Sequence, residues 1–152
     1  MSTYKRILAL VAFNSDSAAV ARRAVQLSRA YGATLALAAV VDYTPGFESD
    51  HAPFLTPGEM RQAIVRDLRE KLDQMTTEAG ADGCEIIVAC GSEKEVVSEL
   101  TDSWRPDLVL VGSNARHGLD QNRARAAYDV LTIQNIRPSF AGRMINALAA
   151  AL

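Results

Sequence analysis

The residues best suited to chemistry lie in a polar loop that follows a short apolar run at residues 108–111. Gly112 ends that run, Gly118 lies further along the loop, and a helix-like pattern at residues 122–135 follows. A strand, a glycine-bearing loop and a helix N-terminus together gather backbone N–H groups around an anion. This stretch therefore predicts a binding site for phosphate or another anion.

Three arginines lie in the same stretch: Arg116, Arg123 and Arg125. Guanidinium groups pair well with phosphate, so these side chains could together hold an anion. The alternative is that they are ordinary solvated residues near the start of a helix, where exposed charges contribute little. The residues themselves leave both interpretations open.

Ser113, His117 and Asp120 lie close together in this loop and suggest a hydrolytic triad. The Gly-x-Ser-x-Gly elbow is absent, however, and three groups from one loop rarely reach triad geometry. His51 and His117 are the only histidines, and no cysteine or histidine cluster has the spacing of zinc ligands. We therefore expect neither an enzyme nor a metal site. A weak hydrolase is a hypothesis for the function that ranks third, after a protein-interaction role and a ligand-binding role.

The scaffold that positions this loop is an alternation of strands and helices. Strands are expected at residues 7–13, 34–41, 85–89 and 107–111, and helices follow each of them, the fourth at residues 122–135. This order predicts one α/β domain over residues 1–152, a doubly wound parallel sheet with helices on both faces. Ligands bind such sheets beyond the carboxyl ends of the strands, so the loops at residues 13–17 and 112–121 should flank any site.

Two helices carry clear start signals. Thr56 and Ser92 are expected N-caps, and each is followed three residues later by a glutamate, Glu59 and Glu95, which completes a capping box. The connection at residues 42–55 is long for a compact domain. It is a candidate lid or interface loop, and the alternative is a mobile surface loop.

Composition limits the classes of partner. The chain has 152 residues and a formal charge of −2, so no basic field indicates a nucleic-acid partner. No apolar run approaches the roughly 20 residues of a membrane helix, and we expect a cytoplasmic protein. Cys84 and Cys90 lie at the two ends of the expected strand at residues 85–89, about 20 Å apart if the chain is extended, whereas a disulfide needs Cα atoms within about 7 Å. We expect two reduced thiols.

Several of these stretches together resemble the universal stress protein family. They are Lys5–Leu8 opening a strand, Gly91 before a capped helix, and the run Asp-Leu-Val-Leu-Val-Gly-Ser at residues 107–113 before a glycine-bearing loop. The resemblance covers about residues 4–138. It implies a five-stranded α/β sheet of adenine-nucleotide-binding ancestry, usually in a homodimer. Some members bind ATP or AMP, and others bind no detectable nucleotide.

The nucleotide-binding members carry an Asp near the end of the first strand and a Gly-x-x-Gly, nine residues, then Gly-Ser or Gly-Thr. Compared with that pattern, only Gly112 is kept, and Ser113 matches the serine that usually follows it. Ala12 replaces the Asp, Ala115 replaces the second glycine, and Arg125-Ala126 replaces the Gly-Ser pair. Alanine offers no side-chain acceptor, and arginine fills space that phosphate would need. The resemblance thus places a degenerate nucleotide site at these positions, together with Val41, Arg116 and Gly118.

The C-terminal part also departs from the family. Pro138 lies where a proline precedes the fifth, edge strand, but residues 139–143 form a poor strand and residues 144–152 favour a short helix. The expected edge strand is therefore degenerate, which affects the family's usual dimer. We predict a cytoplasmic, homodimeric stress-response protein that acts through an unknown protein partner and has no cofactor beyond weak ATP or AMP binding. The alternative is an AMP- or ATP-binding regulatory sensor with an altered phosphate loop.

Overall fold

A computed structural model describes residues 4–12, 17–41, 56–81, 83–112 and 127–134 of the protein. These residues form five strands and three helices. In chain order they are β1 (Arg6–Leu10), α1 (Ser17–Tyr31), β2 (Thr34–Val41), α2 (Pro57–Glu78), β3 (Glu85–Cys90), α3 (Glu93–Trp104), β4 (Leu108–Gly112) and β5 (Asp129–Ile133). The expected positions of the first four strands are confirmed to within a few residues.

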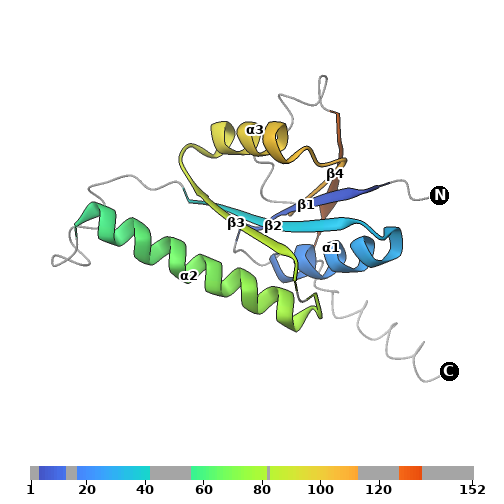
Figure 1. Ribbon diagram of the computed structural model, residues 1–152, viewed down its shortest axis with the longest axis horizontal. Coiled ribbons are helices and arrows are strands. Elements are labelled where there is room, and N and C mark those ends of the chain that lie inside the picture. Colours follow the sequence, from blue (N-terminus) through green and yellow to red (C-terminus); the bar gives the residue numbers. More distant parts are fainter. Residues whose placement is uncertain (1–3, 13–16, 42–55, 82, 113–126, 135–152) are drawn as a thin grey trace, which may run out of the picture.

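The five strands form one parallel sheet in the order β3-β2-β1-β4-β5 (Figure 1). The first strand lies in the middle, where Ile7 pairs with Leu35 of β2 on one side and with Leu108 of β4 on the other. The expected doubly wound parallel fold is therefore confirmed. Long apolar runs suit these strands because both faces of such a sheet are buried.

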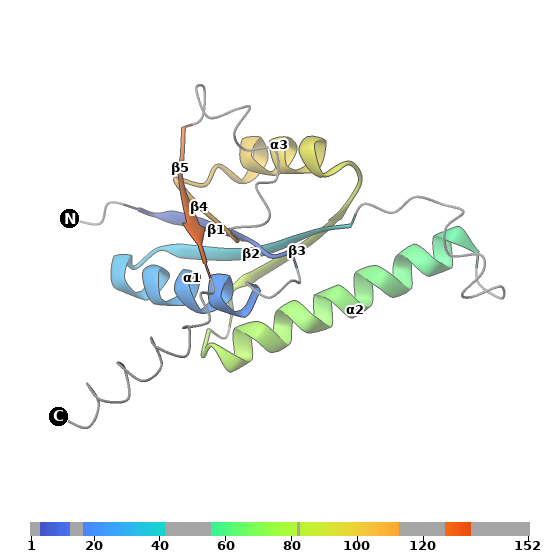
Figure 2. The same ribbon diagram turned by 180° about the vertical axis from the view of Figure 1, so that it is seen from behind.

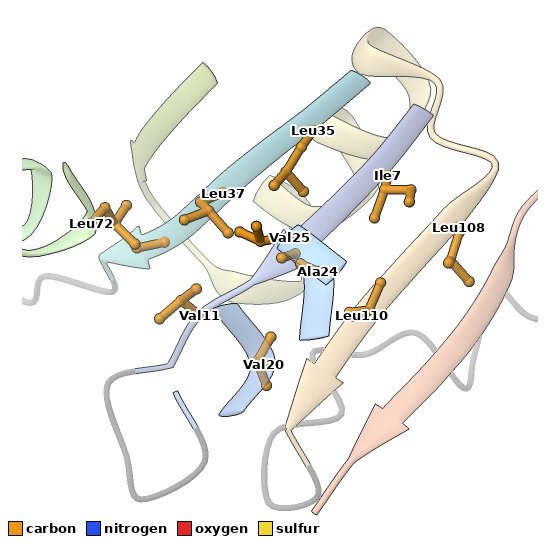
Figure 3. Packing of buried hydrophobic residues seen from close by; sticks show 12 residues of the cluster. Ile7, Val11, Val20, Ala24, Val25, Leu35, Leu37, Leu72, Leu108 and Leu110 are labelled. Carbon is orange, nitrogen blue, oxygen red and sulfur yellow. The ribbon is translucent and has the colours of Figure 1, made fainter. Parts of the chain in front are cut away.

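Helices cover both faces of the sheet. α1 and α2 lie on one face and α3 lies on the other, as the two opposite views show (Figures 1 and 2). Alternate residues of each central strand divide between the two layers: Ile7 and Leu37 pack with α1 and α2, whereas Leu8 and Ala38 pack with Val97 and Trp104 of α3. Figure 3 shows the first of these layers, closed by Val20, Val25 and Leu72.

The helix starts are formed as expected, with one difference. The hydroxyl oxygen of Thr56 accepts a hydrogen bond from the backbone N–H of Glu59 at 3.2 Å, and the same hydroxyl donates to the Glu59 carboxylate at 3.1 Å. Ser92 does occupy the N-cap position of α3, but its side chain makes no capping hydrogen bond. The prediction of a capping box at Ser92 is therefore wrong, although α3 begins at the expected residue.

The expectation of a helix over residues 122–135 is wrong for its second half. Residues 129–133 form β5, which pairs in parallel with β4, from Leu108↔Asp129 to Gly112↔Ile133. The fifth strand thus lies before Pro138. The sequence had instead predicted a degenerate edge strand after Pro138, at residues 139–143. The physical reason is that a free ladder on β4 offers these residues backbone hydrogen bonds, and Val130, Thr132 and Ile133 are β-branched residues that favour a strand.

Side chains at the amino edge of the sheet tie the strands together. Asp107 accepts backbone N–H groups from Lys5 at 2.8 Å and Arg6 at 2.9 Å, which fixes β1 beside β4. The Arg6 guanidinium lies 4.0 Å from the ring centroid of Trp104, and the Trp104 indole N–H donates to Glu85 at 2.9 Å. Trp104 is thus a packing residue that joins α3 to the sheet.

Candidate functional site

The candidate nucleotide site is placed by the carboxyl ends of three neighbouring strands. Val41 ends β2, Ala12 follows the end of β1, and Gly112 ends β4. The three strands are adjacent and parallel, so these residues lie at one edge of the sheet. The sequence prediction that they come together is in agreement with this geometry. Their role in binding stays a prediction.

This edge contains the point where the strand order reverses. The chain moves outward from β1 through β2 to β3, and β4 then returns to the other side of β1. The carboxyl ends of β1 and β4 therefore bound the crevice in which doubly wound proteins hold ligands. Sequence and topology thus point to the same place.

Among the described residues, few side chains at that crevice could bind a ligand. Ala12 is exposed but carries only a methyl group, so it offers no acceptor for a ribose or base. Val41 is 8% exposed, and its carbonyl oxygen already accepts the N–H of Gly91 at 2.9 Å. Gly112 is buried at the end of β4. None of these three residues supplies a side-chain hydrogen bond to a ligand.

The position of β5 limits where a helix can follow the loop after β4. Only about 16 residues, 113–128, separate Gly112 at the end of β4 from Asp129 at the start of β5. Ala127 and Tyr128 form a bend that leads directly into β5. Only these two residues lie between Ala126 and β5, which is fewer than one turn of an α-helix.

The remaining predicted site residues lie outside the described part of the chain. They are Ser113, Ala115, Arg116, Gly118, Arg125 and Ala126. His51, His117 and Asp120 lie outside it as well. In the described ranges, no group of three His, Cys, Asp or Glu side chains could hold a metal ion. None of the described helices combines the length and hydropathy that a transmembrane span requires.

Two hollows that the sequence did not suggest lie beside α1. One, of about 220 Å³, is lined by Arg22 of α1 and by Met75 and Glu78 of α2. The other, of about 410 Å³, is lined by Val25 and Arg29 of α1, by residues just after α2, and by the first residues of β2 and β3. The second hollow lies at the amino edge of the sheet, opposite Ala12. No local sequence pattern indicates either hollow, because each lining is assembled from separate elements of the chain.

Cys84 lines the larger hollow. Burial raises the pKa of its thiol, and the Asp73 carboxylate raises that pKa further. Cys84 and Cys90 are both free, one immediately before β3 and one at its last residue. This agrees with the expectation of two separate thiols. A raised pKa makes Cys84 less nucleophilic at neutral pH.

Fold and site together define a class of protein, the doubly wound α/β proteins with a candidate ligand crevice at the switch point. The sequence model of the universal stress protein family matches residues 3–124. The chain therefore belongs to the universal stress protein family, which confirms the resemblance seen in its sequence.

Individual relatives agree with this family. Universal stress protein A homolog 1 of Coxiella burnetii is 27% identical over 132 residues, which cover 85% of this chain and 92% of the relative. A universal stress family protein from Burkholderia pseudomallei has a TM-score of 0.65 at 22% identity, with 88% and 98% of the two chains covered. One from Arabidopsis thaliana, solved with AMP bound, has a TM-score of 0.58 at 18% identity, with 87% and 92% covered. The two structures share the fold of this protein.

Proposed function

We propose that this protein is a cytoplasmic universal stress protein that acts through contacts with other proteins, and that its nucleotide site is degenerate. It is a homodimer in this proposal and catalyses no reaction. The observation that carries the proposal is the position of β5, because only Ala127 and Tyr128 separate Arg125 and Ala126 from the strand that starts at Asp129.

The end of β1 supports the same proposal. Compared with the family pattern that the resemblance implies, Ala12 replaces an Asp, and its methyl group gives a ribose or base no acceptor. Each lost hydrogen bond to a charged group costs roughly 1.5–3 kcal/mol. Two such losses weaken a micromolar site by roughly two to four orders of magnitude.

Titration calorimetry of the full chain with ATP and with AMP tests this proposal. We expect no binding tighter than about 1 mM, because Ala12 offers no side-chain acceptor and only two residues separate Ala126 from the start of β5. Mass spectrometry of ligand released from the purified, denatured protein should find no adenine nucleotide. Micromolar binding, or nucleotide released in a one-to-one ratio, would overturn the proposal.

The second candidate function is an AMP- or ATP-binding sensor with an altered phosphate loop. It is favoured by the retained Gly112 at the switch point and by the AMP bound to the Arabidopsis relative. In this candidate Arg116 and Arg125 pair with phosphate in place of backbone amides. Calorimetry separates the two functions, and Arg116→Gln with Arg125→Gln would then abolish the observed binding.

A further inference from the structure

β3 is an edge strand of the sheet, and β2 is its neighbour on one side (Figure 1). The two strands pair in an unbroken register, from Ala36↔Glu85 to Val41↔Cys90. No bulge or proline interrupts β3. The outer side of such a strand presents a row of backbone N–H and C=O groups with which another strand can pair.

The hydrogen bonds to β2 show which backbone groups of β3 point outward. Gly91, just after β3, donates its N–H to the carbonyl oxygen of Val41, so Gly91 faces β2. The N–H and C=O of one residue point to the same side of a strand, and successive residues alternate. Ile86, Val88 and Cys90 therefore direct their N–H and C=O groups away from β2. Among the described residues, none hydrogen-bonds to these outward groups.

The side chains in the middle of β3 are apolar and incompletely covered. Ile86 and Val88 pack against the layer of α1 and α2, and Ile87 packs against the layer of α3. All three are only partly buried, whereas Leu37 and Ala38, their partners in β2, are 0% and 1% exposed. A strand added beside β3 would therefore extend both apolar layers and cover the exposed part of these side chains.

The middle of β3 also lacks the features that usually keep an edge strand unpaired, which are charged side chains, prolines and bulges. From Ile86 to Ala89 the strand carries no charge. The charged residue of β3 is Glu85, at its start, and the Glu85 carboxylate accepts the indole N–H of Trp104 at 2.9 Å. This bond directs the carboxylate toward α3 and leaves the outer side of the strand uncharged.

We infer that the β3 edge, which consists of the outward backbone groups of Ile86, Val88 and Cys90, binds an extended segment of a partner protein as a sixth strand. The segment is uncharged and rich in β-branched residues, because such residues suit a half-buried strand between two apolar layers. Its backbone supplies the hydrogen bonds that β3 lacks on this side. This inference rests on the proposed function, since it names the surface and the chemistry of the protein partner.

The same features disfavour other occupants. A partner helix uses its own backbone groups internally and could not pair with those of β3. Nucleic acid needs cationic side chains, and β3 carries none. A second copy could pair through its own β3, but the proposed homodimer is expected to depend on the residues after Pro138. Two different two-fold contacts on one protomer would give open-ended chains in place of a closed homodimer.

The test is calorimetric titration of the full-length protein with a synthetic peptide of alternating valine and threonine, with lysines at both ends for solubility. Two matched peptides each carry two N-methyl groups, either on alternate residues or on adjacent residues. Methyl groups on alternate residues block one edge of the peptide, whereas methyl groups on adjacent residues block both edges.

We expect the unmodified peptide to bind with a dissociation constant below about 1 mM. The alternately methylated peptide should bind within about twofold of it, because one edge can still pair with β3. The adjacently methylated peptide should bind at least about fivefold more weakly. Equal affinities of the two methylated peptides would overturn the inference, because backbone pairing would then not be the source of binding.

Three lysine substitutions locate the binding. Ala89→Lys puts a charge on the partly buried middle of β3 and should weaken the unmodified peptide by at least about fivefold. Ala30→Lys makes the same change at an exposed position of α1, and Thr132→Lys adds a lysine to β5, the opposite edge. Both should change the affinity by less than about twofold. Weakening by Thr132→Lys but not by Ala89→Lys would place the peptide on β5 and overturn the inference.

Amide hydrogen exchange of the unmodified protein, measured by nuclear magnetic resonance, needs no variant. Without peptide, the outward amides of Ile86 and Val88 should exchange faster than those of Ile87 and Ala89, which face β2. Peptide at ten times its dissociation constant should slow exchange at Ile86 and Val88 by about tenfold. Absence of this added protection would overturn the inference.

Two further outcomes would overturn it. One is that the unmodified peptide does not bind. The other is that Ala89→Lys converts a homodimer into monomers in light scattering, because β3 would then pair with a second copy. Nucleotide titration is a separate experiment, so failure of this inference leaves the proposed function standing.

Discussion

Gly91 lies between β3 and α3 with a backbone φ of +142°, which L side chains rarely adopt. A Cβ atom added there would lie 3.0 Å from Cγ2 of Val96, a buried residue of α3. We therefore expect Gly91→Ala to lower the free energy of unfolding by about 1–3 kcal/mol. Chemical denaturation followed by far-ultraviolet circular dichroism measures this.

Gly58→Ala is the matched control. Gly58 lies in the first turn of α2, has no positive φ, and has nothing within 4 Å of an added Cβ. Alanine there should be neutral or should stabilise the protein by up to about 1 kcal/mol, because it restricts the unfolded chain. If both substitutions have the same effect, backbone strain at Gly91 is not the cause.

The two thiols should differ in reactivity. Cys90 is exposed, whereas Cys84 is half-buried and has a raised pKa. In the native protein we expect iodoacetamide to modify Cys90 at least about fivefold faster than Cys84. Because burial raises the pKa of Cys84, its rate should also keep rising to higher pH than the rate of the same cysteine in urea-unfolded protein. Peptide mapping by mass spectrometry gives both rates.

The contrary results are simple to recognise. Equal native rates would mean that Cys84 is as accessible as Cys90. Loss of both free thiols on oxidation, with the mass change of an intramolecular disulfide, would contradict the placement of the two cysteines at opposite ends of β3.

Among the described helices, α2 is the one whose two halves differ most in burial. Leu72 is 0% exposed and Thr76 is 3% exposed, but no residue before Leu72 in the helix is buried. Its first half extends beyond the sheet (Figure 1). Packing against the core thus supports mainly the C-terminal turns.

We therefore expect Leu72→Ala to cost about 2–5 kcal/mol of stability, since it leaves a cavity in the core. Ile64→Ala, two turns earlier on the same stripe and only half-buried, should cost no more than about 1 kcal/mol. Urea denaturation of both variants makes the comparison. A larger loss from Ile64→Ala would show that the first half of α2 is packed against something outside the described residues.

The elements that the sequence predicted well share one property, which is that local pattern and tertiary environment agree. Residues 35–41 are apolar without interruption and form most of β2, which is buried on both faces. The prediction of a helix at residues 129–133 was wrong. The alanines and arginines before them favour a helix, but pairing with β4 makes these residues a strand. The β-branched residues Val130, Thr132 and Ile133 were the available signal.

The candidate site was predictable only in its position. Parallel pairing brings Ala12, Val41 and Gly112 to one edge, which the strand order alone requires. The sequence could not show that β5 starts at Asp129, so it assigned Arg125 and Ala126 to a helix N-terminus. That assignment depended on a count along the loop, and such a count carries no information on where the next element begins.

The assembly of the whole molecule is a prediction that depends on the C-terminal residues. β5 is an edge strand of the sheet, and the chain continues beyond it through Pro138. We expect the full chain to be a homodimer and a chain truncated after Arg137 to lose or weaken that dimer. Light scattering at several concentrations measures the mass of both. A truncated protein that remains a stable dimer would exclude the C-terminal residues from the interface.

Trp104 also gives the molecule a built-in optical probe. It is the only tryptophan in the chain, it is 8% exposed, and its ring contacts Arg6 of β1 while its N–H donates to Glu85 of β3. Tryptophan emission therefore reports a single event, the separation of α3 from those two strands. Comparison of its transition with that of the circular dichroism signal would show whether this layer comes away before the α1 and α2 layer on the other face.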